Sequence, residues 1–155
     1  MRARNLITRS REFIALVEVS TEAATLLILD CDVIQADGGT RTAAITGAAV
    51  ALAMAMNGLV KAGVLKQSPM KQMVAATSVG IVGGAQLLDL CYEEDSQAEV
   101  DMNVVMTADG GLVETQATAE KGNYSRAQLN SLIDLAEVGM KEIFATQIAV
   151  LDSRQ

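Results

Sequence analysis

A glycine-rich segment, DGGTR at residues 37–41, stands between an apolar stretch and a long run rich in alanine and methionine. Glycine lets backbone N–H groups approach an anion closely, and a helix starting here would present unsatisfied N–H groups and its positive dipole end. Thr40 adds a hydroxyl donor, and Arg41 adds a cation that can grip phosphate with two parallel hydrogen bonds. The segment is neither a Walker A loop nor a Gly-x-Gly-x-x-Gly fingerprint. It is either a phosphate site at Gly39, Thr40 and Arg41 or a tight turn before an ordinary helix.

A second group of residues able to do chemistry is acidic. Six carboxylates fall between residues 89 and 101, namely Asp89, Glu93, Glu94, Asp95, Glu99 and Asp101. Crowded carboxylates repel one another unless they are solvated, protonated or neutralised by a divalent metal ion. Asp101 directly precedes an apolar run and should therefore lie at the start of a strand. The segment is either a site for metal binding or acid catalysis, or a solvated acidic turn.

An anion site with a cation and a group of carboxylates are the two parts that phosphoryl transfer needs. The sequence contains no histidine, so acid–base chemistry must use carboxylates, lysine, tyrosine or cysteine. The net charge of −7 argues against RNA binding, because nucleic-acid binders usually carry a basic surface. Clustered arginines are found only near the N-terminus, at positions 2, 4, 9 and 11.

Composition indicates a single domain over residues 1–155 with an aliphatic core, because half of the residues are hydrophobic and only four are aromatic. Cys31 and Cys91 lack a metal-ligand pattern, and we interpret them as reduced thiols of a cytoplasmic protein. Asn57 and Lys61 interrupt the longest apolar run, so we expect no membrane span. The apolar region of a secretory signal does not follow the first arginines.

The hydrophobic pattern predicts an α+β fold, in which a β-sheet built from hairpins is covered by helices on one face. Ser125 and Gln128 are spaced as a capping box for the last helix, and glycine pairs at 83–84 and 110–111 mark two hairpin turns. In chain order, the expected elements are a helix at 6–17, a strand at 25–35, a helix at 42–62, strands at 73–82, 86–90, 101–107 and 112–117, and a helix capped at 125 that runs to about 151.

Long runs of this sequence resemble the ribonuclease PH family. The longest are DCDVIQADGGTRTAAITGA at residues 30–48 and YEEDSQAEVDMNVVMT at residues 92–107. Shorter runs that resemble the family fall at 69–71, 79–82, 118–120 and 145–147. The resemblance covers about residues 25–150 in matching order, and it corresponds to the C-terminal two-thirds of that family.

This resemblance implies a ribosomal-protein-S5-domain-2-like fold. It also implies phosphorolysis, in which inorganic phosphate attacks the 3′-terminal phosphodiester of RNA and a nucleoside diphosphate is released. Gly39, Thr40 and Arg41 would bind the phosphate. Asp95 and Asp101 match the family's catalytic acids, which share general-acid and Mg²⁺-binding roles. The expected substrate is the 3′ end of precursor tRNA, and the expected assembly is a homo-oligomer, a ring-shaped hexamer of dimers.

The sequence departs from the family pattern most clearly at its start, where the family's first strands, a basic segment and a further phosphate-contacting arginine have no counterpart. Cys91 and Ala117 also replace a usually acidic residue and a glycine. We therefore expect a truncated domain whose bare sheet edge invites self-association. Three functions stay open: a phosphorolytic exoribonuclease, a phosphate- or nucleotide-binding module that does not turn over RNA, and an inactive fragment. The intact site residues favour the first, and the missing basic segment favours the other two.

Overall fold

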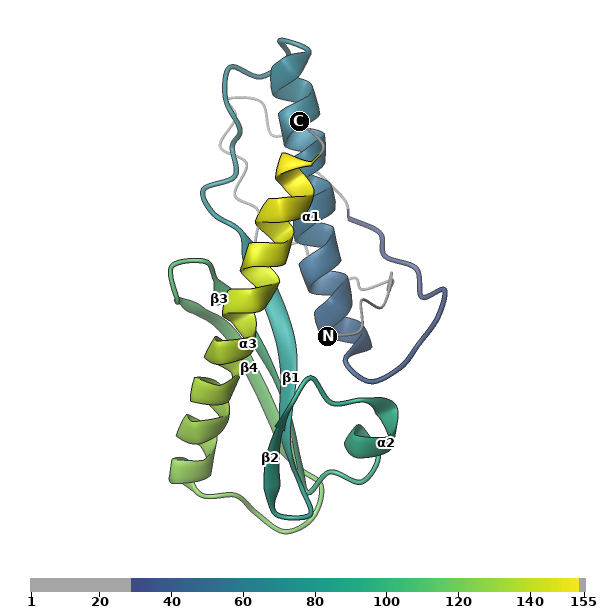
Figure 1. Ribbon diagram of the computed structural model, residues 1–155, viewed down its shortest axis with the longest axis vertical. Helices are drawn as coiled ribbons and strands as arrows, with labels where there is room; N and C mark the ends of the chain where they lie inside the picture. The colour runs from purple at the N-terminus through teal and green to yellow at the C-terminus, as the bar shows by residue number, and fades with distance from the viewer. Residues whose placement is uncertain (1–28, 154–155) are drawn as a thin grey trace.

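A computed structural model describes residues 29–153, which form a four-stranded antiparallel sheet, two long helices and one short helix (Figure 1). The elements are α1 (Thr40–Lys61), β1 (Val74–Val82), β2 (Ala85–Leu88), α2 (Tyr92–Asp95), β3 (Val100–Thr107), β4 (Leu112–Ala119) and α3 (Arg126–Asp152). The strand order across the sheet is β2-β1-β3-β4. The α+β class predicted from the sequence is confirmed.

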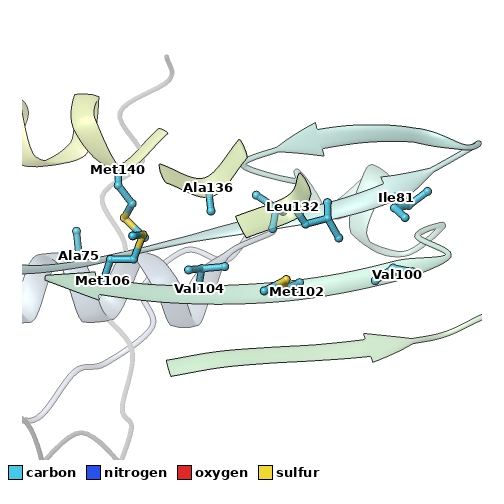
Figure 2. Packing of buried hydrophobic residues seen from close by; sticks show 10 residues of the cluster. Ala75, Ile81, Val100, Met102, Val104, Met106, Leu132, Ala136 and Met140 are labelled. Atoms are coloured by element: carbon cyan, nitrogen blue, oxygen red, sulfur yellow. The ribbon is translucent and has the colours of Figure 1, made fainter. Parts of the chain in front are cut away.

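The side chains of a strand point alternately to the two faces of the sheet, and α3 covers one of these faces. Residues 132, 136 and 140 follow one another at four-residue intervals and therefore lie on one side of α3. Together with the strands they form the main core: Ala75, Val79, Ile81, Val100, Met102, Val104, Met106, Leu132, Ala136 and Met140 (Figure 2). The predicted capping box begins this helix, since Ser125 and Gln128 exchange hydrogen bonds between side chain and backbone.

α1 lies beside β1 and α3, with which it is in contact (Figure 1). β1 pairs with β3 along one edge and with β2 along the other edge, but β2 reaches only from Val79 to Val82. Nearer the start of β1, helix side chains bond to the edge that β2 does not reach. There the hydroxyl of Thr46 donates to the Ala76 carbonyl (3.2 Å) and accepts from the Ala76 N–H (3.0 Å). The buried Gln147 of α3 donates from Nε2 to the carbonyls of Thr46 (3.0 Å) and Val74 (3.1 Å). These two side chains hold both helices against β1 and satisfy backbone groups at its edge.

By length and composition alone, α1 could cross a membrane. Asn57 and Lys61 therefore do not exclude a span by length as expected, because both lie near the end of a 22-residue helix and lower its hydropathy too little. Ile45, Leu52 and Met56 are nevertheless buried within the fold. α1 also packs against β1 and α3.

The strand expected at 25–35 is not found in its described part, because residues 29–35 contain no strand. A strand needs a neighbour that accepts and donates its backbone hydrogen bonds, and the four described strands pair only with one another. Val33 and Ile34 are 46% and 80% exposed, so this segment is not buried against the described sheet. The remaining residues of that strand and the helix expected at 6–17 lie outside the described residues.

Candidate active site

Asp37 joins the glycine-rich segment to the start of the acidic segment. Its Oδ1 accepts hydrogen bonds from the N–H of Gly38 (2.7 Å) and from the N–H of Tyr92 at the start of α2 (2.8 Å). Gly38 lies so close to the backbone of Leu90 and Cys91 that a Cβ here would come within 2.6 Å of the Cys91 carbonyl carbon. The two segments that the sequence presents as separate motifs are therefore held in contact.

Gly39 precedes the first residue of α1 and has a φ of 69°, which residues with a Cβ adopt only with strain. Gly39 has no side chain to cap this helix terminus, and its N–H groups are of the kind that bind an anion. The Thr40 hydroxyl, which the sequence suggested as a phosphate donor, donates to the Asp37 carbonyl (2.8 Å). An anion that accepts a hydrogen bond from this hydroxyl must replace the Asp37 carbonyl as its acceptor.

The side chain of Arg41 reaches β4. Its Nη2 lies 2.8 Å and 2.9 Å from the two carboxylate oxygens of Glu114, and its Nη1 lies 3.4 Å from Oε1 of Gln116. The side chains of Arg41 and Glu114 are 31% and 41% exposed, so solvent screens the pair. The cation predicted to bind phosphate is thus paired with a carboxylate of β4 in this structure.

The two predicted acids lie near each other. Asp95 ends α2, and Asp101 is the second residue of β3. The pKa of Asp101 is raised above its ordinary value because burial penalises the charged form and because the charges of Asp95 and Glu120 repel it. A hydrogen bond with the Met102 backbone opposes this shift. The charge of Asp95 therefore acts directly on Asp101, and Glu120 joins them as a third acid that the sequence analysis did not single out.

Asp101 also lies on the sheet face that α3 leaves uncovered, because it alternates with Val100 and Met102 of the main core. On this face, β3 and β4 contribute three opposed pairs: Asp101 with Thr118, Asn103 with Gln116, and Val105 with Glu114. Ile45 packs against Ala76 and Val105 on the same face. Arg41 lies one turn before Ile45 and so projects from the same side of α1. The fold thus brings Arg41, its two β4 partners and Asp101 to one polar face of the sheet.

Asp95 and Asp101 offer the carboxylate oxygens that Mg²⁺ prefers. Within residues 29–153, no group of three or more His, Cys, Asp and Glu side chains is arranged to hold a metal ion. Mg²⁺ usually uses only one or two carboxylates together with water and substrate phosphates, so a pair of acids fits it without a complete cage. The repulsion that raises the pKa of Asp101 is what a cation bound between the acids would relieve.

Other acids of the segment have structural roles. Glu94 accepts a hydrogen bond from the N–H of Cys91 (2.9 Å) and thereby caps α2, a helical turn that the sequence analysis missed. Asp89 has a φ of 59° in the connection that follows β2. The acidic segment therefore contains residues with structural roles, such as Glu94 and Asp89, and the two candidate catalytic acids, Asp95 and Asp101.

Sequence reasoning also missed Glu114 and Gln116, which are 73 and 75 residues from Arg41 along the chain. The available signal was weak. The two positions are two residues apart in a predicted strand, which places both on one face, but nothing local indicates what lies above that face.

Residues 72–139 match the family described as 3′ exoribonuclease family, domain 2. The chain is 54% identical over 136 residues to ribonuclease PH of Solibacter usitatus, a match that covers 88% of this chain and 57% of that protein. Its fold is similar to that of rice (Oryza sativa) Rrp46 in a crystal structure, with a TM-score of 0.61, 22% identity, and coverage of 79% of this chain and 52% of that chain. The chain thus spans little more than half the length of either protein.

The match to the Solibacter protein includes the candidate site. A match over 136 of 155 residues must contain both the glycine-rich segment at 37–41 and the acids up to 101. The likeness to rice Rrp46, at low identity, bears on the fold alone and agrees with the predicted S5-domain-2-like class. Residues 72–139 therefore match domain 2 of the 3′ exoribonuclease family, and the predicted resemblance of the chain to ribonuclease PH is confirmed.

Proposed function

We propose that this chain carries the reaction centre of a phosphate-dependent 3′→5′ exoribonuclease. In that reaction, inorganic phosphate attacks the terminal phosphodiester of RNA, the bond from phosphorus to the 3′ oxygen breaks, and a nucleoside diphosphate leaves. One observation carries the proposal. Arg41 and Asp101 lie on the same sheet face, with Asp95 close enough to Asp101 to shift its pKa.

Phosphate would bind at the end of this face where α1 begins. Gly39 lies at the helix terminus, whose N–H groups favour an anion, and Arg41 supplies the charge. Along β3, Asp101 is two residues from the position opposite Gln116 and four from the position opposite Glu114, which is roughly 7 to 13 Å of strand. The attacking phosphate and the scissile phosphodiester would occupy this interval between the cation and the acids.

Asp101 is suited to hold the proton that the leaving 3′ oxygen needs. Burial and then the charge of Asp95 raise its pKa, which keeps the carboxyl group protonated to a higher pH than an ordinary aspartate. We assign the general-acid and Mg²⁺-binding roles to these two residues jointly. When bound, Mg²⁺ would neutralise negative charge that gathers on the phosphate oxygens.

The remaining parts of the proposal are a substrate at the 3′ ends of tRNA, a homo-oligomer built as a hexamer of dimers, and a cytoplasmic location. The name of the Solibacter relative supports a ribonuclease. An oligomer would cover apolar side chains that are exposed on the two long helices, Met54, Leu59, Val138, Ile148 and Val150. The net charge of −7 predicts that RNA affinity is weak and falls steeply with salt.

A phosphate- or nucleotide-binding module without RNA turnover is the second candidate. The acidic net charge favours it over RNA turnover, because RNA binding depends on neutralising many backbone phosphates. An inactive fragment would show neither phosphate binding nor turnover.

The test is to incubate the protein with a short single-stranded RNA, Mg²⁺ and inorganic phosphate and to look for nucleoside diphosphates. If the proposed function is correct, nucleoside diphosphates form only when phosphate is present, and Asp95→Asn abolishes their release. Asp134→Asn is the matched control, because it makes the same change at an exposed position of α3. Phosphate binding without diphosphate release would support the binding module instead.

A further inference from the structure

The contact between Arg41 and Glu114 uses the guanidinium nitrogen that a phosphate would need most. Both carboxylate oxygens of Glu114 accept hydrogen bonds from Nη2, at 2.8 Å and 2.9 Å. A guanidinium offers an oxyanion two forked edges, Nε with Nη2 and Nη1 with Nη2, because Cδ blocks the third edge. Each forked edge requires one hydrogen of Nη2. A phosphate that uses either edge with two hydrogen bonds therefore competes with Glu114 for Nη2.

We propose that Glu114 competes with phosphate for Arg41. This proposal rests on the phosphate-binding role of Arg41 in the proposed function. Phosphate binds to Arg41 in exchange for one or both hydrogen bonds between Nη2 and Glu114. Until then the pair neutralises the guanidinium and keeps it over the sheet face, with Gln116 as a weaker partner of Nη1 at 3.4 Å. Glu114 thereby sets the phosphate affinity of the chain.

The exposure of the Arg41–Glu114 pair indicates whether Glu114 or phosphate binds Arg41 more strongly. The two side chains are 31% and 41% exposed, and a solvent-screened ion pair changes an equilibrium by about fivefold at most. A charge-assisted hydrogen bond from arginine to phosphate changes affinity by about ten- to hundredfold. Phosphate therefore displaces Glu114, and the carboxylate lowers phosphate affinity without preventing binding.

Glu114→Gln tests the competition, because glutamine keeps a carbonyl acceptor of the same reach but carries no charge. In calorimetric titrations of the whole chain with inorganic phosphate, this variant should bind about two- to fivefold more tightly than the wild type. Glu137→Gln is the matched control, since it discharges one member of an exposed pair with Lys141 on α3 (3.6 Å) and should leave the affinity unchanged.

The double variant Arg41→Ala/Glu114→Gln shows whether the gain acts through the cation, because a coupled pair gives non-additive effects. The gain should be absent when Arg41 is absent. The proposal is overturned if Glu114→Gln binds phosphate as the wild type does or more weakly, if the gain persists without Arg41, or if Glu137→Gln gives the same gain. It is also overturned if neither the wild type nor Glu114→Gln binds phosphate. Tighter phosphate binding by Glu114→Gln, together with no diphosphate release from RNA by the wild type, would instead support the competition and refute the exoribonuclease.

Discussion

Replacing Arg41 by alanine should weaken phosphate binding while leaving the fold intact. Arg41 is not among the buried core residues, and its side chain is 31% exposed. Folding therefore loses one solvent-screened ion pair with Glu114, which contributes about 0–1 kcal/mol to stability. The free energy of unfolding should fall by no more than about 1 kcal/mol.

The loss of phosphate affinity follows from two opposing contributions. A charge-assisted hydrogen bond to phosphate contributes about 1.5–3 kcal/mol, and separating Arg41 from Glu114 first costs about 0–1 kcal/mol. The net contribution is about 0.5–3 kcal/mol, and the middle of this range corresponds to about a twentyfold change in affinity. Arg41→Lys should recover part of this loss, because lysine restores the charge but not the forked geometry.

The assay is a calorimetric titration with inorganic phosphate beside a urea unfolding curve for each variant. Lys141→Ala is the matched control, because it removes a cation from an exposed ion pair on α3 and should change neither measurement appreciably. Phosphate binding by Arg41→Ala that equals the wild type would show that Gly39, Thr40 and Arg41 are not the phosphate site of this chain. The inactive-fragment interpretation would then take precedence.

Three further predictions concern the acids and the glycine-rich segment. Asp95→Asn should bind phosphate as the wild type does but release no nucleoside diphosphate in the RNA assay, since the segment at the start of α1 is untouched. Because the folded pKa of Asp101 is raised above 3.8, its stabilising contribution is complete below that pH and is lost as pH rises through the raised pKa. Asp101→Asn should therefore have a larger free energy of unfolding in urea than the wild type at about pH 7, but not at about pH 3. A difference between the two proteins that is the same at both pH values would contradict this explanation. Gly38→Ala should destabilise the fold by about 1–3 kcal/mol or more, because its Cβ would meet the backbone at Cys91, whereas Gly47→Ala, which meets nothing within 4 Å, should stabilise α1 by about 1 kcal/mol.

Elements whose signals are local were predictable from the sequence. The turn at Gly83 and Gly84 needs positive φ at two consecutive residues, and both have it, at 58° and 77°. The capping box of α3 needs only Ser125 and Gln128, three residues apart. In each case the residue that carries the signal also makes the interaction, so no distant part of the chain has to be known.

Elements that depend on a distant partner were not predictable in the same way. The apolar pattern before residue 35 is compatible with a strand, but residues 29–35 have no described strand beside them and are not one. The partner of Arg41 was missed for the same reason. Its cationic end could be expected near an anion, but that the anion is Glu114 follows only from the pairing of β4 with β3.

The register of the central strands links the core to the candidate site. Val100, Met102 and Val104 are buried beneath α3, and because side chains alternate along β3, Asp101 must point to the opposite face. A shift of β3 by one residue would carry Asp101 under α3 and expose its apolar neighbours, so burying the core and positioning the acid cannot be separated. The eight consecutive pairs between β1 and β3 fix that register. The hydrophobic pattern of one strand therefore places the carboxyl group of Asp101 on the face that Arg41 reaches from α1.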